Sequence, residues 1–279
     1  MCDGGRPALL GGRSNTVASG AYSAAMLLAI DVGNSNIVVG VFDGDRLVAD
    51  FRLHTDSHAT GDELGLTITG LLRSRGVEPS AITGVVVSSV VPTLSRSIEG
   101  LAQIFFGLSP MVVGPGVRTG MRILYDDPRQ VGADRIVNAI AAYRRYGGPA
   151  VLVDFGTATT FDAISAQGEY LGGAIAPGML ISLEALVAHA AKLSRVDLVA
   201  PSSVIGRTTT TSMQAGMVFG YVGLIEGLVS RMRDELGPGT RVIGTGGIAE
   251  LIASETDCIE VVDQRLTLDG LRLIHELNT

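Results

Sequence analysis

The chain has 279 residues, of which 46% are hydrophobic, and a formal net charge of −7. This length allows one large domain or two domains of ordinary size with an ample core. The negative charge argues against a nucleic-acid partner, and the lack of tryptophan in the sequence leaves few stacking platforms for bases. No run of about 18 apolar residues occurs, which argues against a membrane span. The two cysteines, Cys2 and Cys258, fit a reducing cytoplasm and predict no disulfide framework.

Residues 1–25 differ from the rest of the chain in composition. They are rich in glycine, serine, alanine and arginine, and they show neither hydrophobic periodicity nor the apolar core of a signal peptide. We interpret this segment as a disordered leader or a vector-derived extension. The folded protein is therefore expected to begin at Met26.

The first chemical motif follows an apolar run of strand length. Residues 27–30 are apolar, the run stops at Asp31, and Gly33 follows two residues later. Further apolar runs at 37–42 and 47–53 predict a β-hairpin and a third strand. Gly33 would let the backbone approach a ligand closely, and the small polar residues after it would offer donors to an anion. An acid beside an anion indicates a cation between them, so this motif predicts a metal–nucleotide site.

The same pattern occurs a second time. An apolar run at 151–153 stops at Asp154, small residues follow from Gly156, and runs at 161–164 and 170–175 complete a second predicted hairpin. A single Asp-x-Gly sequence is also common in ordinary turns. Two of them at the heads of matching halves favour an internal duplication. If a pseudo-twofold axis relates the halves, the two aspartates face one another and could hold magnesium.

Helix and strand patterns alternate through the rest of each half. A predicted helix at 212–236 carries glycines three or four residues apart, which indicates tight packing against another helix. The predicted fold class is α/β, with an N-terminal domain at 26–147 and a C-terminal domain at 148–279. The other predicted helices lie at 61–76, 92–106, 136–146, 178–192, up to 252, and 266–277, and the other strands lie at 82–91, 111–113, 241–243 and 259–262.

Three further groups of residues could carry chemistry. Asp134 is either an acid stabilised in the first turn of a helix or a general base that accepts the proton of an attacking hydroxyl. Arg135 could bind an anionic substrate group, or it could pair with Asp126 or Asp127. The glycine-rich turn at 244–247 could contact a nucleoside or a phosphate at a helix N-terminus. Composition alone leaves these alternatives open.

Four motifs occur along the chain: Asp31-Val32-Gly33-Asn34-Ser35, Gly132-Ala133-Asp134-Arg135, Asp154-Phe155-Gly156-Thr157-Ala158-Thr159-Thr160 and Gly244-Thr245-Gly246-Gly247. In this order they resemble the motifs of type III pantothenate kinases, and the resemblance covers Met26 to the C-terminus. Those kinases belong to the superfamily of actin, sugar kinases and heat-shock ATPases. The resemblance implies duplicated actin-like (ribonuclease H-like) domains with a central cleft. It also implies transfer of the ATP γ-phosphate to pantothenate, the first step of coenzyme A biosynthesis.

The resemblance implies roles for individual residues as well. Asp134 would be the catalytic base, Asp154 would bind a monovalent cation (K⁺ or NH₄⁺), and Asp31 would lie on the side of the Mg²⁺ ion that accompanies ATP. The implied ATP contacts are Asp31, Val32, Gly33, Asn34, Ser35, Asn36, Ile37, Val38 and Thr157. The implied pantothenate contacts are Tyr125, Gly132, Ala133, Asp134, Arg135 and Thr209.

The resemblance further implies a cytoplasmic homodimer with its acceptor pocket near the interface, and no nucleic-acid or membrane partner. The family's lysine-asparagine-threonine sequence is replaced here by Arg207-Thr208-Thr209 and two more threonines, so the threonine of 208–211 that contacts the acceptor stays open. Two alternatives also remain. One is a kinase of the same fold that acts on another hydroxy acid, and the other is a nucleotide-binding regulator without kinase activity.

Overall fold

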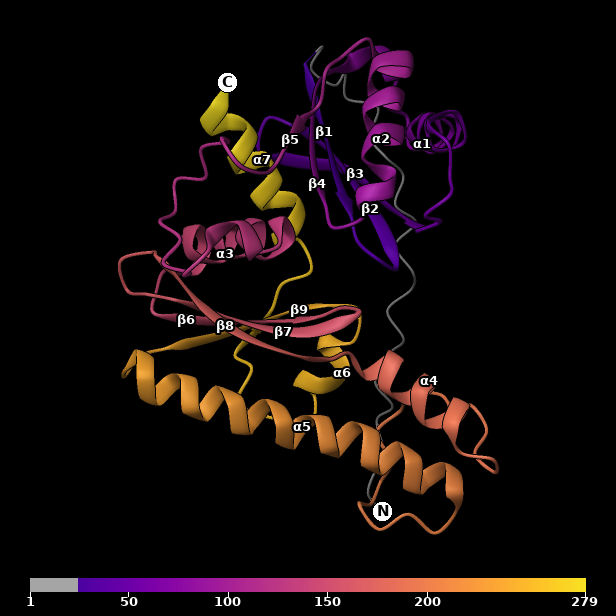
Figure 1. Cartoon of the computed structure of the whole chain (residues 1–279), viewed down its shortest axis with the longest axis vertical. Helices are drawn as coiled ribbons and strands as arrows, with labels where there is room; N and C mark the ends of the chain where they lie inside the picture. The colour runs from indigo at the N-terminus through magenta and orange to yellow at the C-terminus, as the bar shows by residue number, and fades with distance from the viewer. Residues whose placement is uncertain (1–24) are drawn as a thin grey trace, which may run out of the picture.

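The computed structural model describes residues 25–279, so the leader predicted at 1–25 lies, except for Ala25, outside the described residues. The described chain forms two five-stranded sheets (Figure 1). The first has the order β3-β2-β1-β4-β5 and the second the order β8-β7-β6-β9-β10. In each sheet, three antiparallel strands come first in the chain and two parallel strands are added beside the first of them. The predicted duplication is confirmed.

The strands coincide with the predicted apolar runs. The two central strands, β1 and β6, are almost continuously apolar and buried, as expected of strands covered on both faces. The first sheet contains β1 (Met26–Val32), β2 (Asn36–Asp43), β3 (Arg46–His54), β4 (Ile82–Ser89) and β5 (Met111–Val112). The second contains β6 (Ala150–Phe155), β7 (Ala158–Ile164), β8 (Tyr170–Pro177), β9 (Arg241–Gly246) and β10 (Val261–Val262).

The predicted helices are also present, with their ends shifted by a few residues. The first begins at a capping box, in which the side chains of Thr60 and Glu63 each accept the backbone N–H of the other residue. The α-helices are α1 (Gly61–Ser74), α2 (Ser95–Leu101), α3 (Ala133–Tyr146), α4 (Met179–His189), α5 (Thr209–Leu236), α6 (Ala249–Ala253) and α7 (Leu266–Asn278). Short turns of other helix types are η1 (Pro79–Ala81), η2 (Pro92–Leu94), η3 (Ala102–Phe106) and η4 (Pro128–Gln130).

Helices cover both faces of each sheet, and two of them lie between the sheets (Figure 1). On the outer faces, α1 and α2 pack against the first sheet, and α4, α5 and α6 pack against the second. On the inner faces, α7 packs against the first sheet, α3 packs against the second, and these two helices contact each other. We call each sheet with its helices a lobe. The first lobe thus includes the last helix of the chain, and the predicted boundary at 147–148 falls in the turn between α3 and β6.

Within the described chain, the glycines of helix α5 do not pack against another helix as predicted. A β-carbon added at Gly216, Gly220 or Gly223 would meet no atom within 4 Å, so no helix of the described chain packs there. The prediction of tight helix packing at these glycines is therefore wrong within one chain. Among residues 25–279, α5 alone is long and apolar enough to cross a membrane by length and composition, and 44% of its apolar stretch is buried. Its buried side chains belong to the core of the second lobe, as in the core helix of a globular protein.

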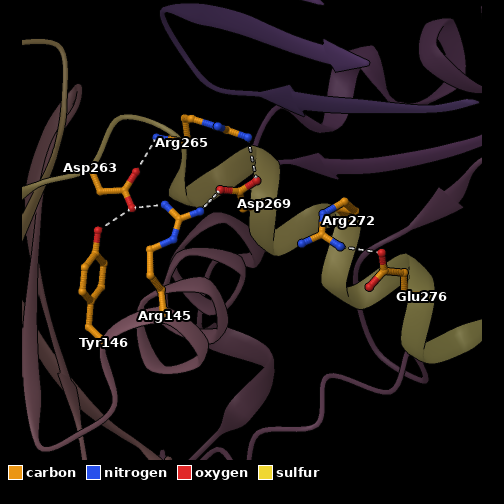
Figure 2. Close-up of polar contacts among 7 residues, drawn as sticks. All are labelled: Arg145, Tyr146, Asp263, Arg265, Asp269, Arg272 and Glu276. Carbon is orange, nitrogen blue, oxygen red and sulfur yellow. Dashed lines mark hydrogen bonds and ion pairs between the residues drawn. The ribbon is translucent and has the colours of Figure 1, made fainter. Parts of the chain in front are cut away.

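A polar network, which we call the α3–α7 network, fastens the end of α3 to the start of α7 (Figure 2). Arg145 donates to the buried carboxylates of Asp263 and Asp269, and the Tyr146 hydroxyl donates to Asp263 at 2.8 Å. Arg265 donates its backbone N–H to Asp263 and its guanidinium to Asp269. The network fixes the start of α7, whose apolar face then covers the first sheet.

Candidate active site

Two turns from different lobes meet at one place, which we call the lobe junction. One turn connects β1 to β2, and the other connects β6 to β7. The hydroxyls of Ser35 and Thr157 are hydrogen-bonded across the junction at 2.8 Å, although 122 residues separate them. Thr55, just after β3, supports the first turn because its hydroxyl donates to the carbonyl of Gly33 at 2.7 Å. The two Asp-x-Gly turns therefore lie side by side, as the predicted pseudo-twofold arrangement requires.

Asp31 lies near the end of β1, opposite Ser88 of the parallel strand β4. The Ser88 hydroxyl donates to an Asp31 carboxylate oxygen at 2.5 Å. Burial raises the pKa of Asp31 to about 7, the Ser88 hydrogen bond opposes the rise, and the negative charge of Asp134 adds to it. A cation bound beside Asp31 would lower this pKa again, so the position favours a positively charged ligand.

Asp154 occupies the corresponding position in the second lobe, opposite Thr245 of β9. The Asn138 side-chain amide donates to Asp154 at 3.1 Å, and the Thr267 hydroxyl of α7 donates to the Asn138 amide oxygen at 2.7 Å. Burial, followed by the charges of three nearby aspartates, raises the pKa of Asp154 to about 7. One residue from each inner helix thus holds this carboxylate in place.

Asp134 lies in the first turn of α3, where this helix meets the lobe junction. Its carboxylate accepts the backbone N–H of Arg135 at 2.8 Å. A β-carbon at Gly132 would lie 2.4 Å from an Asp134 carboxylate oxygen, so the glycine leaves the space that this carboxylate occupies. Burial raises the pKa of Asp134, and the Arg135 N–H opposes the rise. The charge of Asp134 raises the pKa of both Asp31 and Asp154, and the charge of Asp31 also raises that of Asp154, so the three carboxylates lie close together.

A buried arginine–aspartate–tyrosine cluster stands beside Asp134. The Arg135 guanidinium pairs with Asp162 of β7 at 2.7 Å, and the Tyr170 hydroxyl of β8 donates to the same carboxylate oxygen at 2.6 Å. The Tyr125 ring lies 6.5 Å from the Tyr170 ring, measured between centroids. Two of the predicted acceptor contacts, Tyr125 and Arg135, are therefore brought together around Tyr170.

The alternative prediction that Arg135 pairs with Asp126 or Asp127 is wrong. Within the described residues neither of them contacts Arg135, whose partner is Asp162. Asp162 was not predicted as part of the site. The sequence held one signal for it, an acid inside the apolar run at 161–164, because a buried acid requires a partner.

The remaining predicted contacts divide into three groups. Asn34, Ser35 and Asn36 in the first turn are exposed, whereas the side chains of Val32 and Ile37 are fully buried. Val32 and Ile37 can therefore offer a ligand only their backbone. Thr209 begins α5 on the outer face of the second sheet, where it lines a surface cavity of about 710 Å³. Asp134 lies with α3 on the inner face. Within one chain the structure does not bring Thr209 and Asp134 together.

The donor chemistry of the lobe junction suits cations that prefer oxygen ligands. A β-carbon at Gly246 would lie 2.7 Å from an Asp154 carboxylate oxygen, so the glycine leaves room beside that oxygen. Among residues 25–279, no three His, Cys, Asp or Glu side chains are arranged to enclose a metal ion. A cation beside Asp31 or Asp154 would therefore complete its shell with substrate oxygens and water, as Mg²⁺ commonly does.

Comparison with solved structures identifies the class of fold. A Campylobacter jejuni protein assigned to the Baf family of transcriptional activators is similar with a TM-score of 0.57 and 21% identity, over 90% of this chain and 98% of that one. A Sinorhizobium meliloti protein assigned as a 2-dehydro-3-deoxygalactonokinase is similar with a TM-score of 0.58 and 12% identity, over 90% of this chain and 96% of that one. Together with the duplicated sheets, this places the chain in the fold class of sugar kinases and actin-like ATPases.

Comparison of sequences identifies the family. The family model described as "Type III pantothenate kinase" matches residues 27–231. A type III pantothenate kinase of Myxococcus xanthus is 55% identical over 253 residues, which cover 91% of this chain and 99% of that relative. The chain belongs to the type III pantothenate kinase family.

Proposed function

We propose that the protein transfers the γ-phosphate of ATP to the primary hydroxyl of pantothenate, giving 4′-phosphopantothenate in the first step of coenzyme A biosynthesis, in the cytoplasm. The observation that carries this proposal is the convergence of Asp31, Asp134 and Asp154 at the lobe junction. A kinase needs such a set, because phosphoryl transfer depends on positioned groups and on charge stabilisation. A nucleotide-binding regulator would have no use for Asp134.

The nucleotide would bind along the two hydrogen-bonded turns. Backbone N–H groups and small side chains there can surround phosphate oxygens without steric conflict. The exposed turn of the first lobe and Thr157 of the second would hold the β- and γ-phosphates from two sides. The proposed ATP contacts are Asp31, Val32, Gly33, Asn34, Ser35, Asn36, Ile37, Val38 and Thr157.

The acceptor would bind between the start of α3 and the Tyr125 ring. Arg135 and Tyr125 would hold pantothenate, and the guanidinium can pair with its anionic group. Asp134 would accept the proton of the primary hydroxyl while that oxygen forms a bond to the γ-phosphorus and the bond from phosphorus to the ADP oxygen breaks. The raised pKa of Asp134 suits a general base that works near neutral pH. Gly132 and Ala133 would contribute backbone contacts.

Two cations would balance the charge at the lobe junction. Asp31 would lie on the side of the Mg²⁺ ion that arrives with ATP, and Asp154 would bind a monovalent cation, K⁺ or NH₄⁺. Such cations neutralise the charge that develops on the phosphate oxygens during transfer. The pKa values of about 7 support this assignment, since an uncompensated carboxylate at either position would be partly protonated at neutral pH.

We also propose a homodimer. Eight of the large exposed apolar side chains lie on β8, α4 and the segment that follows, and they are Leu171, Ile175, Leu180, Ile181, Leu186, Val199, Val204 and Ile205. The open glycines of α5 add a face that another helix could approach closely. Because Thr209 and Asp134 are on opposite faces of the second sheet, Thr209 of a second copy would be the residue that reaches the acceptor.

An ADP-release assay tests the function directly. We expect ADP production that requires pantothenate and falls when K⁺ is replaced by Na⁺. A panel of other hydroxy acids should give little activity, and preference for one of them would replace pantothenate as the acceptor. ATP binding without ADP release for every acceptor, with K⁺ present, would instead support a regulatory protein. Sedimentation of the same sample should give the mass of two chains, and a single-chain mass would contradict the dimer.

A further inference from the structure

The predicted acceptor contact Arg135 is held by groups that no sequence motif includes. Its Nε donates to the Oδ1 atom of Asp162 at 2.8 Å, and its Nη2 lies 2.7 Å from the same atom. The Tyr170 hydroxyl donates to this oxygen as well, at 2.6 Å. Asp162 and Tyr170 are fully buried, and Arg135 is 8% exposed. One oxygen atom therefore fixes the guanidinium by two of its nitrogens.

The arrangement leaves part of the guanidinium free for a ligand. Among residues 25–279, Nη1 of Arg135 has no hydrogen-bond partner, and it is not among the buried unpaired atoms. The guanidinium carbon lies 5.9 Å from the centroid of the Tyr170 ring, and a β-carbon at Gly173 would be 3.2 Å from Nη2. The Tyr170 ring and Gly173 therefore border a guanidinium that is bound to Asp162 through Nε and Nη2 and has Nη1 unbound in the described chain.

Tyr170 also fixes the segment that carries Tyr125. The backbone N–H of Tyr170 donates to the carbonyl of Arg122 at 2.8 Å, and the N–H of Leu124 donates to the carbonyl of Tyr170 at the same distance. This bridge is the isolated parallel pairing of Ile123 with Tyr170. The backbone of Tyr170 therefore positions one acceptor contact, while its hydroxyl, through Asp162, positions the other.

We infer that Asp162 and Tyr170 are positioning residues for the acceptor, which hold Arg135 and the Tyr125 segment in the geometry that binds pantothenate. This inference rests on the proposed function, in which Arg135 and Tyr125 contact the acceptor. A fixed guanidinium loses little side-chain freedom when a ligand pairs with it, so preorganisation increases affinity. Asp162 and Tyr170 act only through their neighbours and do not touch the reacting atoms.

The test separates acceptor binding from nucleotide binding. In Asp162→Asn the guanidinium loses its charged anchor, and we expect the KM for pantothenate to rise about 10-fold or more while the KM for ATP changes less than about twofold, as for loss of a charge-assisted hydrogen bond. Tyr170→Phe retains the ring and removes the hydroxyl, so a smaller rise of about threefold is expected. If Asp162→Asn does not fold, Tyr170→Phe decides the question alone.

A matched pair of control variants comes from the α3–α7 network. Asp263→Asn and Tyr146→Phe make the same changes in an arginine–aspartate–tyrosine cluster with a buried aspartate at the other end of α3. They should lower the thermal midpoint without changing either KM. Equal effects of Asp162→Asn on both KM values, or effects no different from those of Asp263→Asn, would overturn the inference and indicate a structural role only.

Arg135→Gln distinguishes failure of this inference from failure of the proposed function. A large rise in the KM for pantothenate in Arg135→Gln, with no rise in Asp162→Asn or Tyr170→Phe, would overturn the positioning role alone. An unchanged KM in Arg135→Gln would overturn the proposed acceptor contact and this inference with it.

Discussion

Helix α3 has the same chemistry at both of its ends. At its start, Arg135 pairs with a buried aspartate that also accepts a tyrosine hydroxyl. At its end, Arg145 pairs with another buried aspartate, Asp263, and Tyr146 donates to that carboxylate (Figure 2). The two clusters contain the same three residue types, yet one lies at the lobe junction and the other joins α3 to α7.

The two arginines use their donors differently. Arg145 donates from Nη1 to Asp263 and from Nη2 to Asp269, so its fork is shared between two carboxylates. Arg135 directs Nε and Nη2 to one oxygen of Asp162, which leaves Nη1 without a partner in the described chain. Both terminal nitrogens of Arg145 are thus occupied by carboxylates of the fold, whereas Arg135 keeps one terminal nitrogen, Nη1, with which it can bind a ligand.

The neighbours of the two clusters differ as well. Asp134, beside the first cluster, has a pKa raised by burial, and its charge raises that of Asp31 and Asp154. In the second cluster the pKa of Asp263 is lowered, because hydrogen bonds and the Arg145 charge outweigh its burial. The charges and hydrogen bonds near the carboxylates at the lobe junction thus do not offset their burial, whereas those near Asp263 at the far end of α3 do. Uncompensated charge of this kind marks functional sites.

The largest effect is expected at the start of α3. Asp134→Asn should reduce kcat about 100-fold or more and leave the KM for ATP nearly unchanged, because the amide cannot accept the hydroxyl proton. The thermal midpoint should not fall, since the substitution removes a charge whose burial is only partly offset by the Arg135 charge and N–H. Asp126→Asn changes an exposed aspartate nearby and should behave as wild type. Turnover near the wild-type rate in Asp134→Asn, measured by ADP release, would exclude Asp134 as the base.

At the end of α3 we expect a smaller effect of the opposite kind, in which stability falls and activity does not change. Arg145→Met leaves the buried carboxylates of Asp263 and Asp269 without their shared partner, which should lower the free energy of unfolding by about 2–3 kcal/mol. Both KM values should stay within about twofold of wild type. Arg144→Met is the control, because Arg144 is an exposed neighbour on the same helix.

Denaturant unfolding of the two variants would show the difference. Equal stabilities of Arg145→Met and Arg144→Met would mean that the α3–α7 network contributes nothing measurable. A large rise in either KM with unchanged stability would mean that the far end of α3 belongs to the site after all.

The duplicated hairpins could be predicted from the sequence because their signal is local. Apolar runs of strand length on either side of the turn at Gly33 define one hairpin, and the same pattern around Gly156 defines the other. The position of α7 could not be predicted in the same way. Its pattern shows that one face is buried, but the pattern is the same whichever sheet covers that face. Only the α3–α7 network and the core around Leu271 select the first sheet.

The residues of the candidate site also fall into those that a local motif predicts and those that depend on tertiary contacts. Asp31, Asp134 and Asp154 each stand in a short motif, so their types and order could be identified from the sequence. Asp162 could not be assigned to Arg135, because 27 residues separate them and Asp126 and Asp127 are nearer in sequence. A pairing between a helix and a strand depends on register and burial, which no local pattern records. The open glycines of α5 are a similar case, since spacing shows a small-residue face but not what covers it.

The smallest expected effect is the pH dependence of stability in cation-free buffer. A rise in pH should remove the stabilising contribution of Asp154 at the lobe junction and restore that of Asp263 in the α3–α7 network. Asp154 has a pKa of about 7 in the folded protein, well above the ordinary value of an aspartate, so the folded state binds its proton more tightly than the unfolded state. The contribution of Asp154 to stability is therefore full below about pH 4 and is lost as the pH rises toward 7. Asp263, whose pKa is lowered, contributes above about pH 4 and loses that contribution as the pH falls.

Comparison of wild type with Asp154→Asn isolates the first of these contributions. The variant should be more stable than wild type at pH 8 by a few degrees in thermal midpoint, and the advantage should shrink at pH 5, where wild-type Asp154 is mostly protonated. The effect is modest because Asp154 is only half-buried and shares its electrostatic environment with other carboxylates. Addition of K⁺ should stabilise wild type and not the variant, if the cation binds this carboxylate. If the difference in thermal midpoint between wild type and Asp154→Asn does not change with pH, the charge of Asp154 is already compensated in the folded protein. The contrast between the lobe junction and the α3–α7 network would then rest on Asp134 and Arg135 alone.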